Sequence, residues 1–167
     1  MALHVVMGVS GCGKSSVASA LATATGGLFI EGDDFHSPAN KAKMSAGIPL
    51  NDGDRAEWLD RLNRELSGFQ DSGKEVFLSC SALRESYRKR LGEGLPPLHF
   101  IYLKGSRECI AKRLAQRTGH FMPPSLLESQ FATLEEPKDA LVVPIDQPLE
   151  GIVAEILSAL RRTPAKD

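Results

Sequence analysis

The sequence predicts a three-layer α/β fold, in which helices cover both faces of a parallel β-sheet. Short apolar runs alternate with helical patterns along the whole chain, as they do when each strand is connected to the next by a helix. The length of 167 residues and the hydrophobic content of 42% are those of one globular domain with a sizeable core. The chain has no repeat, low-complexity tract or linker, so we expect a single domain over residues 1–167.

Five short apolar runs are the predicted strands. They are too short for helices and contain Val, Ile or Phe, which favour extended structure. They cover residues 3–7, 28–30, 76–78, 99–103 and 141–143. Ligands of such parallel sheets bind beyond the carboxyl ends of the strands, so we expect the loops after the strands to carry the functional residues.

Amphipathic patterns between these strands predict the helices. They cover residues 14–25, 38 to about 47, about 52–69, a segment inside 79–90, 106–117 and about 149–160. Ser37 followed by Pro38 is typical of a helix N-terminus. In the third helix, Leu59 and Leu62 recur at helical spacing, and we place Trp58 in the core beside them. The segment 118–124, TGHFMPP, interrupts the helical pattern.

The composition argues against several classes of partner. The net charge of −1 gives no electrostatic reason to expect nucleic acid. No apolar run approaches the roughly 20 residues that cross a bilayer, and the N-terminus does not resemble a signal peptide. The three cysteines, Cys12, Cys80 and Cys109, have neither the spacing of a disulfide framework nor that of a zinc site. We therefore expect a soluble cytoplasmic protein with no nucleic-acid or membrane partner.

Residues 8–15, GVSGCGKS, match the phosphate-binding pattern G-x-x-x-x-G-K-[ST] and lie between a predicted strand and a predicted helix. In such a loop, backbone N–H groups cradle the phosphates, Lys14 contacts the β- and γ-phosphates, and the Ser15 hydroxyl binds Mg²⁺. A glycine-rich turn without a ligand is the alternative. Since no guanine-reading N-K-x-D motif is present, we expect adenine, and hence ATP and Mg²⁺. We interpret Cys12 as a small side chain that the loop tolerates.

Three carboxylates, Glu31, Asp33 and Asp34, lie at the end of the second strand. Like charges at this spacing are unfavourable unless they share a cation or a proton, and a nucleotide site would supply Mg²⁺ or a substrate hydroxyl. We predict that Asp33 orients an acceptor hydroxyl and accepts its proton. The alternative is a pair of turn residues bonded to the local backbone.

Basic residues near the 118–124 break suggest a lid. Arg113 and Arg117 are four residues apart on one helix, and a lid that bears arginines can neutralise a transferring phosphoryl group and exclude water. Cations near a helix C-terminus, favoured by the helix dipole alone, are the alternative. Arg55 and Arg84 follow strand-end loops and are candidates for an anionic substrate, although single arginines are more often solvated surface residues.

Seven segments of the chain resemble signature blocks of the gluconate kinase family. They are MGVSGCGKS, EGDDFHSPANKAKM, GIPLNDGDRAEWL, CSALRESYR, FIYLKG, RTGHFMPPSLLESQFATLEEP and IDQPLEGIV. Only the first is shared widely with other proteins. The resemblance implies ATP-dependent phosphorylation of D-gluconate on its 6-hydroxyl, which yields 6-phospho-D-gluconate and ADP for the pentose phosphate or Entner–Doudoroff pathway. It also implies a P-loop kinase fold like that of shikimate and adenylate kinases, with five parallel strands in the order 2-3-1-4-5, a lid at about 118–136 and a homodimer.

The resemblance further implies roles for particular residues. Those implied to bind ATP are Gly8, Val9, Ser10, Gly11, Cys12, Gly13, Lys14, Ser15, Ser16, Arg113 and Asp146, with Ser15 as the magnesium ligand. Those implied to bind gluconate are Asp33, His36, Lys43, Arg55, Ser81, Arg84, His120 and Gln130. Lys14, Asp33 and Arg117 are the implied catalytic residues.

The sequence departs from the family pattern at two points. Cys12 stands where the family commonly has serine, and the third strand ends in Ser79-Cys80-Ser81 without a Walker-B aspartate. Either Asp33 or Glu31 is then needed to complete the magnesium shell. Two other functions stay open: another small-metabolite kinase such as shikimate kinase, whose glycine triplet after strand three is missing here, and a nucleotide-dependent switch without an acceptor.

Overall fold

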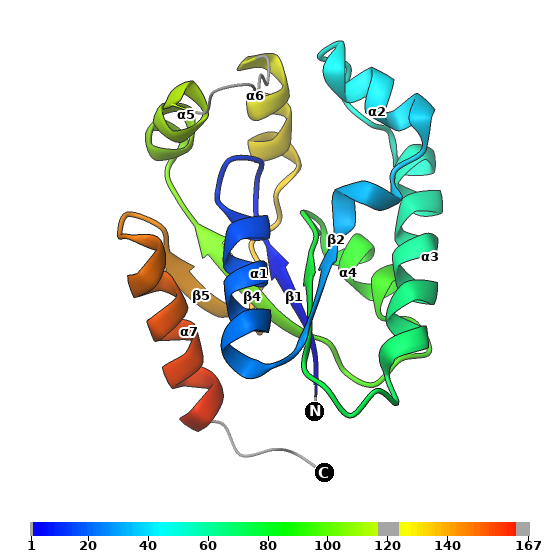
Figure 1. Cartoon of the computed structure of the whole chain (residues 1–167). Helices are drawn as coiled ribbons and strands as arrows, with labels where there is room; N and C mark the ends of the chain where they lie inside the picture. The colour runs from blue at the N-terminus through cyan, green and yellow to red at the C-terminus, as the bar shows by residue number, and fades with distance from the viewer. Residues whose placement is uncertain (1, 117–123, 163–167) are drawn as a thin grey trace.

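The computed structural model describes residues 2–116 and 124–162. In this part of the chain, one sheet contains five parallel strands in the order β2-β3-β1-β4-β5 (Figure 1). The strands are β1 (Leu3–Met7), β2 (Leu28–Glu31), β3 (Val76–Ser79), β4 (His99–Lys104) and β5 (Leu141–Pro144). The predicted fold class and strand order are confirmed, and each strand differs from its predicted range by at most one residue.

Helices connect the strands in the predicted alternation. They are α1 (Lys14–Thr25), α2 (Pro38–Ser45), α3 (Asp52–Phe69), α4 (Glu85–Leu91), α5 (Arg107–Gln116), α6 (Pro124–Thr133) and α7 (Leu149–Arg162), with one 3₁₀ turn, η1 (Gly32–Phe35). The sequence patterns did not predict η1, which is too short to show a period, or α6, which lies inside the predicted lid. None of the described helices is both long and apolar enough to span a membrane.

Each face of the sheet has its own hydrophobic core, because successive side chains of a strand point to opposite faces. Val6 of β1 packs in one cluster with Leu21 of α1 and Ile156 of α7. Its neighbour Val5 packs in a second cluster with Leu62 of α3. All five side chains are fully buried, so the sheet is the middle of three layers, as predicted.

The loops that follow the strands gather at one end of the molecule. Figure 1 shows α2, α5 and α6 at this end, beyond the carboxyl ends of the strands and beside the loop between β1 and α1. This is the edge at which parallel sheets bind their ligands. The glycine-rich loop, the carboxylates after β2 and the residues after β3 therefore face one another across a common edge.

Gly32 fixes the position of the η1 turn at this edge. Its N–H donates to the Ser79 hydroxyl (3.2 Å), and its carbonyl accepts a hydrogen bond from Trp58 Nε1 (2.8 Å). A Cβ at this position would collide with the Ser79 carbonyl oxygen, so only glycine fits between β2 and β3. Trp58 of α3 is buried in the core, as predicted. Its indole N–H also fixes the position of the η1 turn through the hydrogen bond to Gly32.

The close approach at Gly32 is testable against a glycine that lacks it. We expect Gly32→Ala to lower the free energy of unfolding by about 1–3 kcal/mol, because the added methyl group must displace the Ser79 backbone. Gly68 lies near the end of α3 with open space around it, so Gly68→Ala should leave stability unchanged or raise it by up to about 1 kcal/mol. Urea unfolding of both variants measures the difference. Equal stabilities would contradict the assigned role of Gly32.

Candidate active site

The loop between β1 and α1 has the backbone shape of a phosphate cradle. Gly8, Gly11 and Gly13 have φ angles of +147°, +86° and +94°, which side-chain-bearing residues rarely adopt. A Cβ at Gly8 would lie 2.7 Å from Cys12 Sγ and 2.9 Å from the Leu103 carbonyl oxygen. Gly13 is the N-cap of α1 and places no side chain over the first N–H groups of that helix. No side chain of the N-cap occupies these groups, so they are available to an anion, and phosphate binding here stays a prediction.

Cys12 is a packing residue of this loop. Its side chain is fully buried and belongs to the core cluster between the sheet and α1. Burial raises the pKa of the Cys12 thiol, so the group stays protonated at neutral pH. This supports the interpretation of Cys12 as a small side chain within the cradle.

Lys14 and Ser15 are the first side chains of α1. Lys14 Nζ donates to the carbonyl of Val9 in the same loop (3.1 Å) and so lies across the cradle. The Ser15 hydroxyl makes no hydrogen bond with another described residue and is half-buried. Among the described residues no group of three or more His, Cys, Asp or Glu side chains could hold a metal ion alone.

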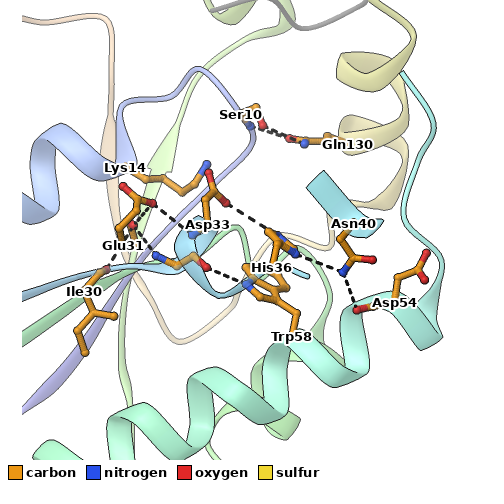
Figure 2. A network of polar contacts seen from close by, with 12 residues as sticks. Ser10, Lys14, Ile30, Glu31, Asp33, His36, Asn40, Asp54, Trp58 and Gln130 are labelled. Atoms are coloured by element: carbon orange, nitrogen blue, oxygen red, sulfur yellow. Dashed lines mark hydrogen bonds and ion pairs between the residues drawn. The ribbon is translucent and has the colours of Figure 1, made fainter. Parts of the chain in front are cut away.

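Glu31 and Asp33, which follow β2, differ in their hydrogen bonds within the protein and in their exposure. Glu31 Oε1 accepts hydrogen bonds from the Ser79 hydroxyl (2.8 Å) and from the backbone N–H of Asp33 (3.4 Å). The Asp33 side chain is 75% exposed and lies 3.9 Å from His36 Nε2. Of these two carboxylates, Asp33 is therefore the one that is open to a ligand, and its place beside Glu31 and His36 is seen in Figure 2.

The charges of Lys14 and Asp33 both affect the pKa of the buried Cys80 thiol. Burial raises the pKa of Cys80 to about 12, while the positive charge of Lys14 lowers it and the negative charge of Asp33 raises it. Both charges are thus within electrostatic reach of the end of β3. Lys14 and Asp33 therefore lie near the same end of β3.

His36 is buried behind Asp33. Its ring stacks on the Trp58 indole, with ring centroids 4.1 Å apart, and the Asn40 amide donates to its Nδ1 (3.4 Å). Burial lowers the pKa of His36 to about 4, which leaves the imidazole neutral at pH 7. Because Nδ1 accepts from Asn40, the ring proton is on Nε2, the nitrogen that faces Asp33.

Two of the predicted cationic substrate residues are paired within the protein. Lys43 Nζ is 2.8 Å from the Asp54 carboxylate, and this hydrogen bond is the main cause that lowers the pKa of Asp54. Arg55 donates to the Tyr87 hydroxyl (3.2 Å) and stacks over its ring. Tyr87 in turn donates to Asp52 (2.6 Å). Both cations therefore have partners already.

Ser81 and Arg84 follow β3. Ser81 is half-buried, and its carbonyl accepts a hydrogen bond from the N–H of Gly8 (3.3 Å), which joins this loop to the phosphate cradle. Arg84 is the N-cap residue of α4 and is exposed. Its guanidinium makes no hydrogen bond or ion pair with the other described residues, so it is the uncommitted cation of this part of the site.

Gln130 of α6 contacts the tip of the cradle at two points. Its Oε1 accepts a hydrogen bond from the N–H of Ser10 (2.6 Å), and its Nε2 donates to the Ser10 hydroxyl (2.9 Å) (Figure 2). Gln130 was predicted on the lid side of the substrate. The structure places it against the phosphate cradle through Ser10.

A pocket opens beside the cradle, between α1, α5 and α7. It is lined by Gly11, Cys12, Gly13, Ser16, Val17, Arg113, Gln116, Leu149 and Ile152. Arg113 donates to the Ile145 carbonyl (2.8 Å), which fixes it at the edge of this pocket. Asp146 is exposed beside Ile145 and does not line the pocket. Spacing alone does not distinguish Gln116, Leu149 and Ile152 from ordinary helix positions, so they were not predicted as pocket residues.

Arg117 and His120 lie outside the described residues, so their predicted roles stay predictions. Other residues of the site escaped the sequence analysis. Asn40 and Asp54 hold His36 and Lys43, and only the Asn51-x-x-Asp54 capping box, a helix N-terminus signal, could have drawn attention to Asp54.

The chain matches known proteins over most of its length. The family model described as "AAA domain" matches residues 3–137. The thermoresistant gluconokinase of Escherichia coli (strain K12) is 47% identical, over 96% of this chain and 94% of that protein. The gluconokinase of Gluconobacter oxydans (strain 621H) is 51% identical, over 81% of this chain and 76% of that protein.

Solved structures of related proteins are also similar to this chain. A gluconokinase from Sinorhizobium meliloti 1021 superposes with a TM-score of 0.87 at 50% identity, over 96% of this chain and 92% of that chain. A shikimate kinase from Bacteroides thetaiotaomicron has a TM-score of 0.68 at 16% identity, which shows a common fold alone. With such similarity over nearly its whole length, the chain belongs to the gluconokinase family.

Proposed function

We propose that this protein is an ATP-dependent gluconokinase, which transfers the γ-phosphoryl group of ATP to the 6-hydroxyl of D-gluconate. The products are 6-phospho-D-gluconate and ADP, in the catabolism of sugar acids. One observation carries the proposal beyond family membership: an exposed carboxylate, Asp33, shares an edge of the sheet with a complete phosphate cradle and its lysine. A donor site and a candidate base for an acceptor hydroxyl are thus adjacent.

The donor half of the site suits a nucleoside triphosphate. The N–H groups of the cradle and of the first turn of α1 bind the phosphates, and Lys14 exchanges its contact with the Val9 carbonyl for phosphate oxygens. The pocket beside Arg113 takes the nucleoside. In this half the protein lowers the barrier by placing fixed donors around the charge that develops on the phosphoryl group.

The oxygen donors at the site fit a magnesium ion that arrives with the nucleotide. Mg²⁺ prefers one or two protein oxygens together with substrate phosphates, and the Ser15 hydroxyl and the exposed Asp33 carboxylate offer these. Glu31 is the weaker candidate, because Ser79 and the Asp33 N–H already occupy its Oε1. When bound, the ion neutralises charge on the β- and γ-phosphates.

The acceptor half needs a base and a cation. Asp33 orients the 6-hydroxyl and accepts its proton, while the neutral His36 behind it presents an N–H rather than a competing positive charge. The carboxylate of gluconate requires a cationic partner. Arg84 is favoured, because Lys43 and Arg55 are already paired with Asp54 and Tyr87. The cytoplasmic location, the homodimer and the lid role of Arg117 stay predictions.

A coupled assay of ADP release tests the proposed activity. With Mg·ATP, we expect gluconate to accelerate ADP release far above the rate with water as acceptor, because a bound acceptor holds its hydroxyl in position for transfer and water is not so held. Shikimate and a panel of other sugar acids serve as comparison acceptors. If gluconate gave no acceleration, the proposed function would be wrong, and slow turnover that no acceptor changes would favour a nucleotide-dependent switch.

Substitution of Asp33 tests the proposed base. We expect Asp33→Asn to lower kcat by about 10²–10⁴-fold, the usual contribution of a general base. The dissociation constant of ATP measured without Mg²⁺ should stay within a few-fold of the wild-type value, because Asp33 does not contact the nucleotide itself in this proposal. Asp34, its exposed neighbour, provides the matched control, and Asp34→Asn should retain kcat. Steady-state kinetics and nucleotide titration give both quantities. Retention of full kcat by Asp33→Asn would remove its assigned role.

Substitution of Arg84 tests the proposed carboxylate partner. We expect Arg84→Gln to raise the KM for gluconate by about 10–100-fold, the effect of losing a charge-assisted hydrogen bond, with little change in the KM for ATP. Lys89, exposed on the same helix, is the control position. Lys89→Gln should change neither KM. An unchanged KM for gluconate in Arg84→Gln would assign the carboxylate to another cation.

A further inference from the structure

We propose that Arg88 is a positioning residue for the gluconate half of the site: together with Glu135 it holds the β3–α4 loop (residues 80–84) in the shape that presents Ser81 and Arg84. The inference rests on the proposed function for its consequence in catalysis. Its physical basis is a set of hydrogen bonds to the backbone of this loop.

Three consecutive carbonyls of the β3–α4 loop each accept from a different element. The Ser81 carbonyl accepts from Gly8 N–H in the phosphate cradle (3.3 Å). The Ala82 carbonyl accepts from the Arg88 guanidinium on α4 (2.7 Å). The Leu83 carbonyl accepts from the N–H of Glu135, just after α6 (2.7 Å). The loop is therefore held from three sides at successive peptides.

Ala82 adopts a backbone conformation that alanine disfavours. Its φ angle is +44°, the only positive φ of a non-glycine residue in the described part of the chain. The left-handed region costs an L-residue roughly 1–2 kcal/mol, and such strain persists only where the surrounding contacts over-determine the backbone. The hydrogen bond from Arg88 to the Ala82 carbonyl is the contact made directly to the strained residue.

Arg88 is buried without a carboxylate partner. Its relative exposure is 9%, and it forms no ion pair with another described residue. Burial lowers the pKa of Arg88, which the charges of Glu135 and Glu85 only partly oppose. Its described hydrogen bonds go to two backbone carbonyls, those of Ala82 (2.7 Å) and Glu135 (3.0 Å). Burying this charge costs free energy, and we infer that the cost is offset because the guanidinium fixes the Ala82 and Glu135 backbone segments together.

The same contacts connect the β3–α4 loop to the chain that follows α6. Glu135 Oε1 accepts from the N–H of Glu85 at the start of α4 (3.1 Å), next to Arg84. The residues just before Glu135 form α6, whose Gln130 is bonded to Ser10 in the cradle. Arg88 thus sets the distance between the residues that bind gluconate and the helix that touches the phosphate cradle.

The test combines substitutions of Arg88 with a substitution of Ala82, the residue whose strained backbone it holds. Arg88→Met should raise the KM for gluconate by about tenfold or more, with the KM for ATP within about threefold, because only the acceptor loop relaxes. Arg88→Lys, which keeps the charge but cannot bridge both carbonyls, should have an intermediate KM. Adding Ala82→Gly should recover several-fold of the lost affinity, because glycine holds a positive φ without strain.

Two controls separate positioning from general stability. Arg90 lies on the same helix and pairs with Asp60 at the surface, so Arg90→Gln should leave both KM values unchanged. Ala82→Gly alone should have near wild-type kinetics, since relief of strain offsets the loss of a buried methyl group. If kcat and both KM values fell or rose together in the Arg88 variants, or if Ala82→Gly gave no rescue, Arg88 would be a structural residue only.

A second readout does not depend on gluconate. Urea midpoints of the wild type, the two single variants and the double variant form a thermodynamic cycle. Non-additive midpoints would support the proposed restraint of Ala82 by Arg88 even if gluconate were not the substrate. The double variant should be less stable than the sum of the single effects predicts, because relaxation of the loop in Arg88→Met already removes part of the strain that Ala82→Gly relieves. Additive midpoints would overturn it. If Arg88→Met does not fold, the same cycle is made with Arg88→Lys.

Discussion

The proposed acceptor half of the site depends on one close contact, the insertion of the Gly32 peptide between β3 and Trp58. The Ser79 hydroxyl accepts from its N–H, the indole donates to its carbonyl, and the Ser79 carbonyl leaves no room for a side chain. These restraints place Asp33, the next residue, at the edge of the sheet. A rigid support of this kind is what the proposed role of Asp33 as a base requires, because a shift of about 1 Å is costly to catalysis.

The two halves of the site are built by different means. The phosphate cradle is local: eight consecutive residues supply its glycines, its lysine and its hydroxyl, and the following helix supplies the dipole. The acceptor half joins segments distant in sequence, since its loop after β3 is held by the cradle, by α4 and by the chain that leaves α6. Change of acceptor can therefore proceed by altering these junctions while the cradle stays fixed.

This difference decides what the sequence could predict. Strands, most helices and the cradle follow from local periodicity and a contiguous motif, and the structure has them where predicted. Partners distant in the chain leave no such signal. Lys43 and Arg55 were predicted as cations for the substrate, yet Asp54 and Tyr87 hold them. In the sequence, nothing distinguishes Arg88 from an ordinary helix residue. Its burial and its hydrogen bonds to carbonyl groups are visible only in the structure.

His36 shows how burial sets the chemistry of its neighbour. A protonated histidine beside Asp33 would bind that carboxylate as an ion pair and compete with a substrate hydroxyl. Burial of the ring, which stacks on Trp58, instead keeps it neutral, with its pKa lowered to about 4. The unfolded chain binds this proton near pH 6.5, so the stability that His36 contributes is lost as the pH falls from there toward 4. Burial of His36 therefore makes the fold less stable in acid, and the same burial gives Asp33 a neutral neighbour at pH 7.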